Sequence, residues 1–314
     1  MNIKLPLLKK EKKKIKFKKN FFLKTISTIA IILLSIYIFF KIIVMVSQVT
    51  VLEFLLTIIP KENLSGVNIL AFGIDQTKSV QRADTLMLIH LNPNDKKINI
   101  LSIPRDTRLK VNGQGLTKVN HAYAHGKEPL LKESISNLLG LPIHFYIKIN
   151  LNNVKTIIDE IGGVEVDVEK NLYYEDKAGG LYIDIKKGQQ LLNGKQAVQY
   201  LRFRQDKESD IGRIKRQQKL LTSINQTLNQ KGKLFQLPVF IRKLSNLIET
   251  DLSIREMLSL SNTIIEIFRE GKIQKETLPG KITLIDGVSF WKPNITQMDT
   301  LIKDKIIQST DKIN

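Results

Sequence analysis

The chain has 314 residues, a formal net charge of +19 and no cysteine. The lack of cysteine excludes a thiol nucleophile, a disulfide framework and a cysteine–zinc site. The four histidines show no zinc-binding spacing such as H-E-x-x-H, so the sequence does not indicate a histidine metal centre.

The basic charge is concentrated at the N-terminus, where eleven lysines and one glutamate give residues 1–41 a charge of +10. Residues 1–20 are predicted to be a basic cytoplasmic tail that is attracted to anionic lipid. Residues 21–46 are apolar but interrupted by Lys24 and Lys41, and the 16 residues between these lysines fall slightly short of a full span. A span needs ~20 residues, but lysines near helix ends can snorkel to the interface. We therefore predict one transmembrane helix with a cytoplasmic N-terminus.

Other interpretations of the N-terminus stay open. The lysine tail can be merely solubilising, or an arm for nucleic acid, although the apolar segment directly behind it favours the membrane. That segment can also be an uncleaved signal sequence, which gives the same topology, since no A-x-A-like cleavage site follows it. In both cases we expect a single-pass protein of the cell membrane, with the rest of the chain outside the cytoplasm. We therefore expect no nucleic-acid partner.

From residue 66 onward, apolar runs of strand length alternate with helical patterns. Residues 47–65 are predicted to be a connecting helix and linker, and residues 66–230 a single catalytic domain. Strands are predicted at Val67–Gly73, Asp84–Leu91, Ile98–Ile103, Ile143–Ile149, Val164–Val168 and Leu201–Arg204. Helices are predicted at Glu128–Leu139, Leu151–Ile161, Asn193–Tyr200 and Ile211–Gln230. This alternation predicts an α/β fold, a three-layer α-β-α sandwich around a mixed, partly antiparallel sheet.

Residues 231–314 are predicted to be a C-terminal extension that packs on the same domain. Its helical patterns cover Pro238–Leu247, Ile254–Arg269 and Ile295–Ile307. A strand pair is predicted at Lys272–Leu278 and Ile282–Phe290. These patterns assign no role to the extension.

Charged residues interrupt the apolar strands where the predicted topology brings them together. Asp75 ends the first strand, Asp84 begins the second and Arg105 follows the third. If the strands run up, down and up, all three meet at one sheet edge, because a register that pairs 91 with 98 also pairs 84 with 105. Two carboxylates beside arginines are suited to hold magnesium against a phosphate. Each aspartate alone, however, can simply cap a turn or pair with an arginine.

The segment from Tyr200 to Gln218 is the most informative part of the sequence. Arg202 and Arg204 alternate with Leu201 and Phe203, so on a strand both guanidinium groups share one face. Asp210, Arg213 and Gln217 fall three and four residues apart, on one face of the next helix. Arginine forks beside a helix N-terminus suit a phosphate or pyrophosphate site.

Other cations near these segments have less specific interpretations. Lys118 lies in a loop before a helix, where it either joins the anion site or belongs to a plain helix entry. Lys215 and Arg216 are expected to face solvent. Arg105 can also form a surface ion pair with Asp106.

Seven segments together, in this order, resemble the signatures of the LytR-CpsA-Psr family of cell-wall glycopolymer ligases. The resemblance covers about residues 66–225, with a membrane helix in the family's usual place. The segments are Phe72-Gly-Ile-Asp75, Arg82-Ala-Asp-Thr85, Ser102-Ile-Pro-Arg-Asp-Thr107, Lys118-Val-Asn-His-Ala-Tyr123, Ile161-Gly-Gly-Val-Glu-Val-Asp167, Leu192-Asn-Gly-Lys-Gln-Ala197, and Arg202-Phe-Arg204 with Asp210 through Gln217. Two positions depart from the family pattern: Ala83 replaces the usual Ser, and His125-Gly126 replaces a common Gly pair.

The resemblance implies transfer of a phosphoglycan from a polyprenyl-pyrophosphate carrier to a peptidoglycan hydroxyl, with magnesium and without ATP. It implies metal ligation by Asp75 and Asp84. The implied pyrophosphate ligands are Arg82, Arg105, Lys118, Arg202, Arg204, Arg213 and Gln217. The candidate catalytic residues are Asp75, Arg82, Arg105, Arg204 and Asp210. The polyprenyl chain needs an apolar slot, for which helices at Ile211–Leu221 and Leu130–Leu139 are candidates, although such apolar stripes commonly form ordinary core.

Two other functions stay open at this stage. One is hydrolysis of a polyprenyl pyrophosphate, with water as the acceptor. The other is a membrane-anchored, non-catalytic regulator that binds an anionic envelope polymer. Carboxylates inside the arginine cluster favour an enzyme, because a polyanion binder gains nothing from them.

Overall fold

The computed structural model describes residues 29–42, 66–74, 81–92, 95–177, 180–205, 209–230, 245–270 and 272–307. Residues 29–42 form a helix within the predicted span at 21–46. None of the helices in the described ranges is both long and apolar enough to be assigned as a membrane span. The predicted tail at 1–20 and the predicted connection at 47–65 lie outside those ranges.

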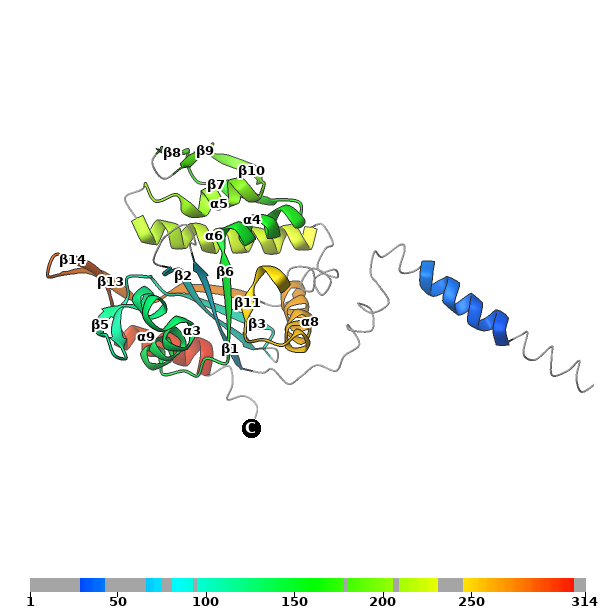
Figure 1. Cartoon of the computed structure of the whole chain (residues 1–314), viewed down its shortest axis with the longest axis horizontal. Coiled ribbons are helices and arrows are strands. Elements are labelled where there is room, and N and C mark those ends of the chain that lie inside the picture. The colour runs from blue at the N-terminus through cyan, green and yellow to red at the C-terminus, as the bar shows by residue number, and fades with distance from the viewer. Residues whose placement is uncertain are drawn as a thin grey trace, which may run out of the picture. The chain divides into compact units, whose positions relative to one another are not determined.

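A six-stranded mixed sheet forms the centre of the domain (Figure 1). Its strands, from edge to edge, are β11 (Glu249–Thr250), β6 (Phe145–Asn150), β1 (Val67–Ile74), β2 (Ala83–Asn92), β3 (Lys97–Ser102) and β12 (Lys272–Thr277). The strand β1 runs antiparallel to β2 and parallel to β6, and β12 runs parallel to β3. Both edge strands come from the part of the chain after residue 245. The predicted mixed α/β architecture is therefore confirmed.

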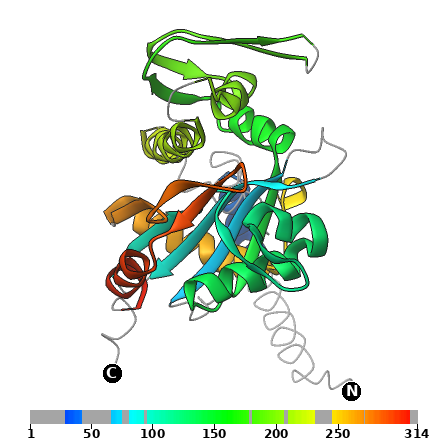
Figure 2. The same cartoon turned by 90° about the vertical axis from the view of Figure 1, so that its left-hand side faces the viewer.

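Helices cover both faces of this sheet, because alternate residues of each strand are apolar on opposite sides (Figure 2). On one face, Leu70, Phe72 and Leu88 pack against α3 (Val119–Leu139) and α9 (Ile295–Ile302). On the other face, Ile69 and Ile100 pack in a cluster with residues of α6 (Ser209–Gln230) and α8 (Ile254–Glu270). A π-helical turn, Lys303–Ile307, continues α9.

A third apolar cluster lies on the far side of α6, where the helix also packs against a group of hairpins. The cluster includes residues of α4 (Leu151–Glu160), α5 (Gly194–Arg202), and the pairs β7–β10 (Val164–Val168, Gly188–Leu192) and β8–β9 (Leu172–Asp176, Leu181–Ile185). Two more hairpins lie at the end of the sheet: β4–β5 (Arg108–Val111, Gly115–Lys118) and β13–β14 (Gly280–Ile285, Val288–Pro293).

Several predicted elements were wrong in a way that affects the site. Leu201–Arg204 is not a strand, because α5 continues to Arg202 and only Phe203 onward is extended. Buried Ala197 and Tyr200 lie three residues apart, which is helical spacing. Lys272–Leu278 does not pair with Ile282–Phe290; β12 joins the central sheet instead, and β13 pairs with β14.

Other differences concern element ends and missed hairpins. The helix α3 begins at Val119 rather than Glu128, and it is kinked at Gly126 and Lys127. The pairs β4–β5 and β8–β9 were not predicted. Of the predicted helix Pro238–Leu247, only Ser245–Leu247 is described, and it is a short 3-10 turn.

Candidate active site

Arg105 is the centre of a network of charged side chains at the end of the sheet. Its Nη1 donates to Asp84 Oδ1 over 2.8 Å, and its Nε donates to Asp210 Oδ2 over 3.1 Å. These contacts join the start of β2, the exit of β3 and the first turn of α6. The loop after β3 continues the hairpin register, since Ile103 N donates to Leu86 O. The predicted meeting of residues 84 and 105 is confirmed.

Two further arginines converge on the same carboxylates. Arg204 Nη2 lies 3.9 Å from Asp84 Oδ2, and Arg213 Nη2 lies 3.3 Å from Asp210 Oδ1. The side chain of Arg213 is only 4% exposed, yet its Nε and Nη1 have no hydrogen-bond partner in the described part of the chain. A buried cation with unpaired donors is costly, so its environment favours an anionic ligand.

The electrostatics of the network differ from one arginine to the next. Burial, followed by repulsion from Arg204, lowers the pKa of Arg213 to about 10. Burial and the charge of Arg105 likewise lower the pKa of Arg204. For Arg105, burial also disfavours the charge, but attraction by Asp210 and Asp84 outweighs it and raises the pKa. All three arginines are therefore charged at neutral pH, and two of them are held at an energetic cost.

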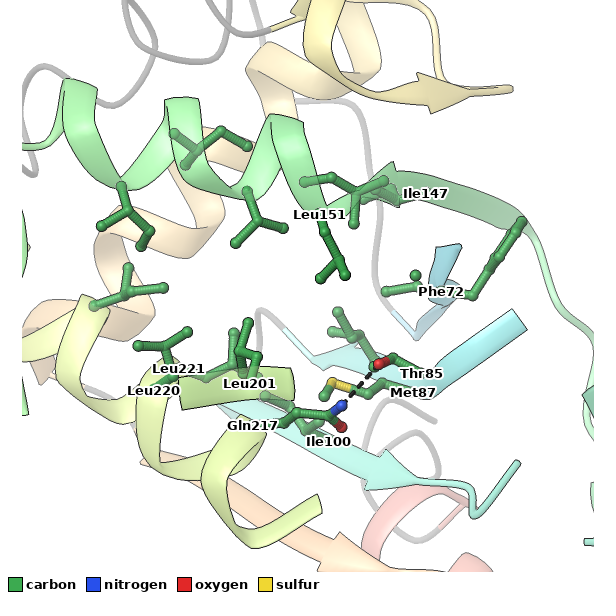
Figure 3. Close-up of a pocket in the computed structure, with 18 of the residues that line it drawn as sticks. Phe72, Thr85, Met87, Ile100, Ile147, Leu151, Leu201, Gln217, Leu220 and Leu221 are labelled. Carbon is green, nitrogen blue, oxygen red and sulfur yellow. Dashed lines mark hydrogen bonds between the residues drawn. The ribbon is translucent and has the colours of Figure 1, made fainter. Parts of the chain in front are cut away.

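A large cavity opens beside this network, between the sheet and the helices α4, α6 and α8 (Figure 3). Its volume is about 970 Å³. Asp84, Thr85, Arg202, Arg204, Arg213 and Gln217 line one end. Gln217 Nε2 donates to Thr85 Oγ1 over 2.7 Å across this end, as Figure 3 shows.

Away from the arginines, the cavity wall is mainly apolar. The lining residues of the sheet extend along β2 from Thr85 to Leu91, a length of about 20 Å at the rise of a strand. On α6 the lining continues from Gln217 to Leu220, Leu221 and Ile224. The cavity therefore has the form of a binding site for an amphiphile, with a cationic end and a long apolar body.

On the other side of Arg105 lies a second, smaller group of charges. Lys118 Nζ pairs with Asp106 Oδ1 over 3.2 Å, and Asp106 lies 4.0 Å from Arg105 Nε. Arg82 is exposed just before β2, and its charge contributes to lowering the pKa of His121, after burial as the first cause. Thus Lys118 and Arg82 flank the network rather than line the cavity.

The structure changes three details of the predicted site. Arg202 and Arg204 do not share a strand face, since Arg202 ends α5 and Arg204 follows in extended backbone; both nevertheless line the cavity. Arg216 does not face solvent: it is 3% exposed and donates to Phe203 O over 2.7 Å and to Glu169 Oε1 over 3.2 Å. Of the two helices predicted to line a slot, α6 lines the cavity, whereas α3 packs on the opposite face of the sheet.

The predicted metal site is only partly described. Asp75 lies outside the described residues, while Asp84 lies at the cavity end, 15% exposed and paired with Arg105. Within the described ranges, no three His, Asp or Glu side chains gather as a metal site. One carboxylate at the cationic end of a cavity does fit magnesium, which commonly takes one or two carboxylates and completes its shell with water and phosphate.

Two contacts in the site were not predicted from the sequence. Thr85 accepts the hydrogen bond of Gln217, and Asp106, expected only as a partner of Arg105, also anchors Lys118. Both residues lie inside the motifs noted above, so their position was a signal. The part of the cavity wall that α8 forms, including Met257, Leu260 and Ile264, could not be predicted from the sequence. An apolar stripe on a helix is equally compatible with packing in an ordinary hydrophobic core.

Comparison with known proteins identifies relatives over most of this domain. Residues 46–306 match the LytR_cpsA_psr family. The polyisoprenyl-teichoic acid–peptidoglycan teichoic acid transferase TagV of Bacillus subtilis is 32% identical over 250 residues, which are 75% of this chain and 63% of that protein. Its crystal structure superposes with a TM-score of 0.69 at 29% identity, over 80% of this chain and 99% of the solved one.

Of two further relatives, one is named as a transferase and the other as a regulatory protein. The transferase TagU of Enterococcus faecalis is 30% identical over 253 residues, which are 78% of this chain and 81% of that protein. The regulatory protein MsrR of Staphylococcus aureus is 32% identical over 182 residues, which are 57% of this chain and 54% of that protein.

Proposed function

The chain belongs to the LytR-CpsA-Psr family, and from this premise we propose that it is a membrane-anchored phosphotransferase. It moves a phosphoglycan from a polyprenyl-pyrophosphate carrier to a hydroxyl of peptidoglycan. The relatives TagV and TagU are named as transferases of this type, which supports the proposal. The N-terminal helix anchors the chain in the cell membrane, with the catalytic domain outside the cytoplasm.

The observation that carries the proposal is the pairing of an arginine cluster with a long apolar cavity. Arg202, Arg204 and Arg213 lie at one end of the cavity, and the buried donors of Arg213 lack a partner in the described part of the chain. A polyprenyl pyrophosphate has the matching form: two phosphates at the end of an extended hydrocarbon chain. The apolar wall takes the hydrocarbon, and the guanidinium forks take the phosphate oxygens.

In the proposed reaction, the acceptor hydroxyl oxygen attacks the phosphorus that carries the glycan. The bond from that phosphorus to the bridging oxygen breaks, and polyprenyl phosphate leaves with the electron pair. Arg204 and Arg213 stabilise the charge on the leaving phosphate, because preorganised cations in a site shielded from water are effective there. Arg105 holds the attacked phosphoryl group, and Asp210, fixed by Arg105 and Arg213, receives the hydroxyl proton.

Magnesium is part of this proposal, with Asp84 and Asp75 as its protein ligands. When bound, it neutralises charge on the pyrophosphate oxygens. Arg105 orients Asp84 for this role through the 2.8 Å hydrogen bond. The energy of the pyrophosphate bond drives the transfer, so no ATP is required outside the cytoplasm.

The test is mass analysis of the products formed by the full chain in detergent. The donor is a polyprenyl-pyrophosphoryl sugar, and the acceptor is a soluble peptidoglycan fragment. We expect polyprenyl monophosphate together with a phosphosugar–peptidoglycan adduct. Monophosphate with free sugar phosphate, both with and without acceptor, would identify a hydrolase instead. No cleavage under conditions in which a relative such as TagV is active would favour a regulatory role, as the name of MsrR denotes.

A further inference from the structure

The hairpin β13–β14 is attached directly to the segment that carries Arg105. Trp291 N donates to Asp106 O over 2.9 Å, and Trp291 bridges to Thr107. The hairpin projects from the end of the sheet beside β5 (Figure 1). It lies on the side of Arg105 away from the cavity, because Asp84 and Arg213 line the cavity whereas Asp106 and Lys118 do not.

One face of the hairpin carries an aromatic ring between cations. Residues 281, 283 and 285 share this face with 288, 290 and 292. The ring of Phe290 is partly exposed, with Lys118 Nζ 5.5 Å and Arg108 Cζ 5.7 Å from its centroid. Both cations come from the neighbouring β4–β5 hairpin.

The cations form two like-charged pairs directly across their strands. Arg108 is the register partner of Lys118, and Lys281 is the register partner of Lys292. Like charges directly opposite each other destabilise a hairpin. Lys118 is compensated by Asp106, but Arg108, Lys281 and Lys292 have no carboxylate partner among the residues that the structure describes. An anion placed across these cations would reduce their mutual repulsion.

The in-line geometry of phosphoryl transfer indicates which substrate approaches Arg105 from the side away from the cavity. In phosphoryl transfer, the attacking and leaving oxygens are roughly in line through the phosphorus. The leaving polyprenyl phosphate lies toward the cavity, so the attacking hydroxyl approaches from the opposite side of Arg105. That side is formed by Asp106, Lys118 and the β13–β14 hairpin.

We propose that the face formed by Phe290, Arg108, Lys281 and Lys292 docks the acceptor, a glycan strand that bears anionic peptide stems. A sugar ring packs on the exposed part of Phe290, and carboxylates of the peptide stem pair with Lys281 and Lys292. This inference rests on the proposed function, and it adds the surface that selects the acceptor.

The hairpin contains its own optical probe, because Trp291 is the sole tryptophan of the chain. Binding of a soluble peptidoglycan fragment to the full chain in detergent is therefore measured by tryptophan fluorescence, without any turnover. We expect a saturable change in the wild type. Phe290→Ala, and separately the double variant Lys281→Gln/Lys292→Gln, should each weaken binding by about tenfold, the scale of one lost aromatic contact or two ion pairs.

Two controls separate this surface from the rest of the molecule. Tyr173→Ala removes an aromatic that is 60% exposed, and so more exposed than Phe290, from the β8–β9 hairpin and should leave fragment binding unchanged. A fragment whose stem carboxylates are amidated should bind wild type and the double lysine variant equally. Melting temperatures show whether the Phe290→Ala hairpin is intact, and the lysine variant, which removes a like-charged pair, is not expected to unfold.

Turnover separates this proposal from the proposed function. Donor cleavage with water as acceptor should proceed equally in wild type and both hairpin variants, while the KM for the peptidoglycan fragment rises in the variants. If no donor is cleaved by wild type, the proposed function fails, but the fluorescence titration still decides whether the face binds glycan. Unchanged fragment affinity in both variants, or competition by the donor polymer for the same face, would overturn the docking proposal.

Discussion

Arg105, just after β3, donates a 2.8 Å hydrogen bond to Asp84 near the start of β2. The last backbone pair between these strands is Met87 with Ser102, and the same register continued by three residues places Asp84 opposite Arg105. The side chains thus continue the sheet after its backbone pairing has ended. Because Arg105 also binds Asp210, it connects the sheet to α6 and fixes the end of the cavity.

Arg204→Lys should lower turnover of the lipid pyrophosphate by ~10²-fold, because an ammonium cannot reproduce a planar two-donor fork on a phosphate. The fold should be retained, since the partly exposed Arg204 makes only a 3.9 Å ion pair with Asp84. Turnover and melting temperature are measured together. Arg255→Lys, an exposed position on α8, is the matched control. If Arg204→Lys turns over as fast as wild type, the phosphate clamp is wrong.

Replacing Arg216 with lysine should affect the stability of the fold, in contrast to the same substitution at Arg204. Arg216 is buried, with hydrogen bonds to Phe203 O and Glu169. Arg216→Lys should therefore cost about 1–3 kcal/mol of unfolding free energy, the range for a buried charged group that loses a partner. Urea denaturation measures this loss, and an unchanged midpoint would contradict it.

Arg213→Met should abolish turnover without lowering stability. Arg213 is charged and 4% exposed, it has two donor groups without partners in the described chain, and it is repelled by Arg204. Asp210 keeps its 3.1 Å hydrogen bond with Arg105 when Arg213 is replaced, so the substitution leaves no uncompensated buried carboxylate and relieves the repulsion from Arg204. The measurement is the melting temperature without substrate, which should be equal or higher. A clear decrease would mean that the ion pair with Asp210 dominates instead.

Asp84→Asn should reduce turnover by ~10²-fold or more, as expected when a key electrostatic group is lost. We also expect the wild type to lose activity in a chelator and regain it with added magnesium. The variant should need a higher magnesium concentration for its residual activity. Wild-type activity that persists in chelator, together with an Asp84→Asn variant near wild type, would exclude the metal role.

The stability of the domain should fall between pH 6.5 and about 4 because of His90. Burial, and then the nearby His144, lower the pKa of His90 from 6.5 to about 4, and its Nδ1 hydrogen-bonds to Asn68 Oδ1 over 2.8 Å. The unfolded chain binds a proton to this residue at a higher pH than the folded one, so acid favours unfolding across that window. The full effect is on the order of 3 kcal/mol. Urea denaturation of His90→Asn should show a smaller pH dependence, and an identical one would contradict this account.

Ala71→Leu should narrow the cavity, since Ala71 lines it from β1. Long polyprenyl donors should lose turnover, while a donor with a short prenyl chain should be cleaved as in wild type. The ratio of the two rates is the measurement, and the short donor is its own control. Equal losses for both donors would show that the cavity does not hold the hydrocarbon chain.

Much of the site follows from local sequence, because strand register and helix spacing are short-range properties. The meeting of Asp84 with Arg105 came from counting across one tight turn, and the contact of Asp210 with Arg213 came from helical spacing. The same reliance on short-range pattern placed Arg202 wrongly, on a strand instead of at the end of α5. Its alternation with Leu201 and Phe203 is compatible with a strand over four residues, but buried Tyr200 and Ala197 extend the helix.

What the sequence did not predict depends on contacts between distant segments. Nothing local distinguishes Arg216, which is buried under Phe203, from the solvent-facing cation that was expected. The role of residues 245–307 was also hidden, because β11 and β12 pair with β6 and β3, strands far away in sequence. Short apolar runs do not specify their partners, so the sheet edges and one cavity wall appear only in the assembled fold.

The position of β12 also determines when the cavity can be completed as the chain folds. Ile273 of β12 and Ile264 and Phe268 of α8 line the cavity, so its wall is incomplete until the chain has been made as far as β12. A chain that emerges N-terminus first therefore presents its arginines before it has a closed apolar wall. The cavity is therefore closed late in folding, once β12, which follows α8 in the chain, has paired with the distant strand β3.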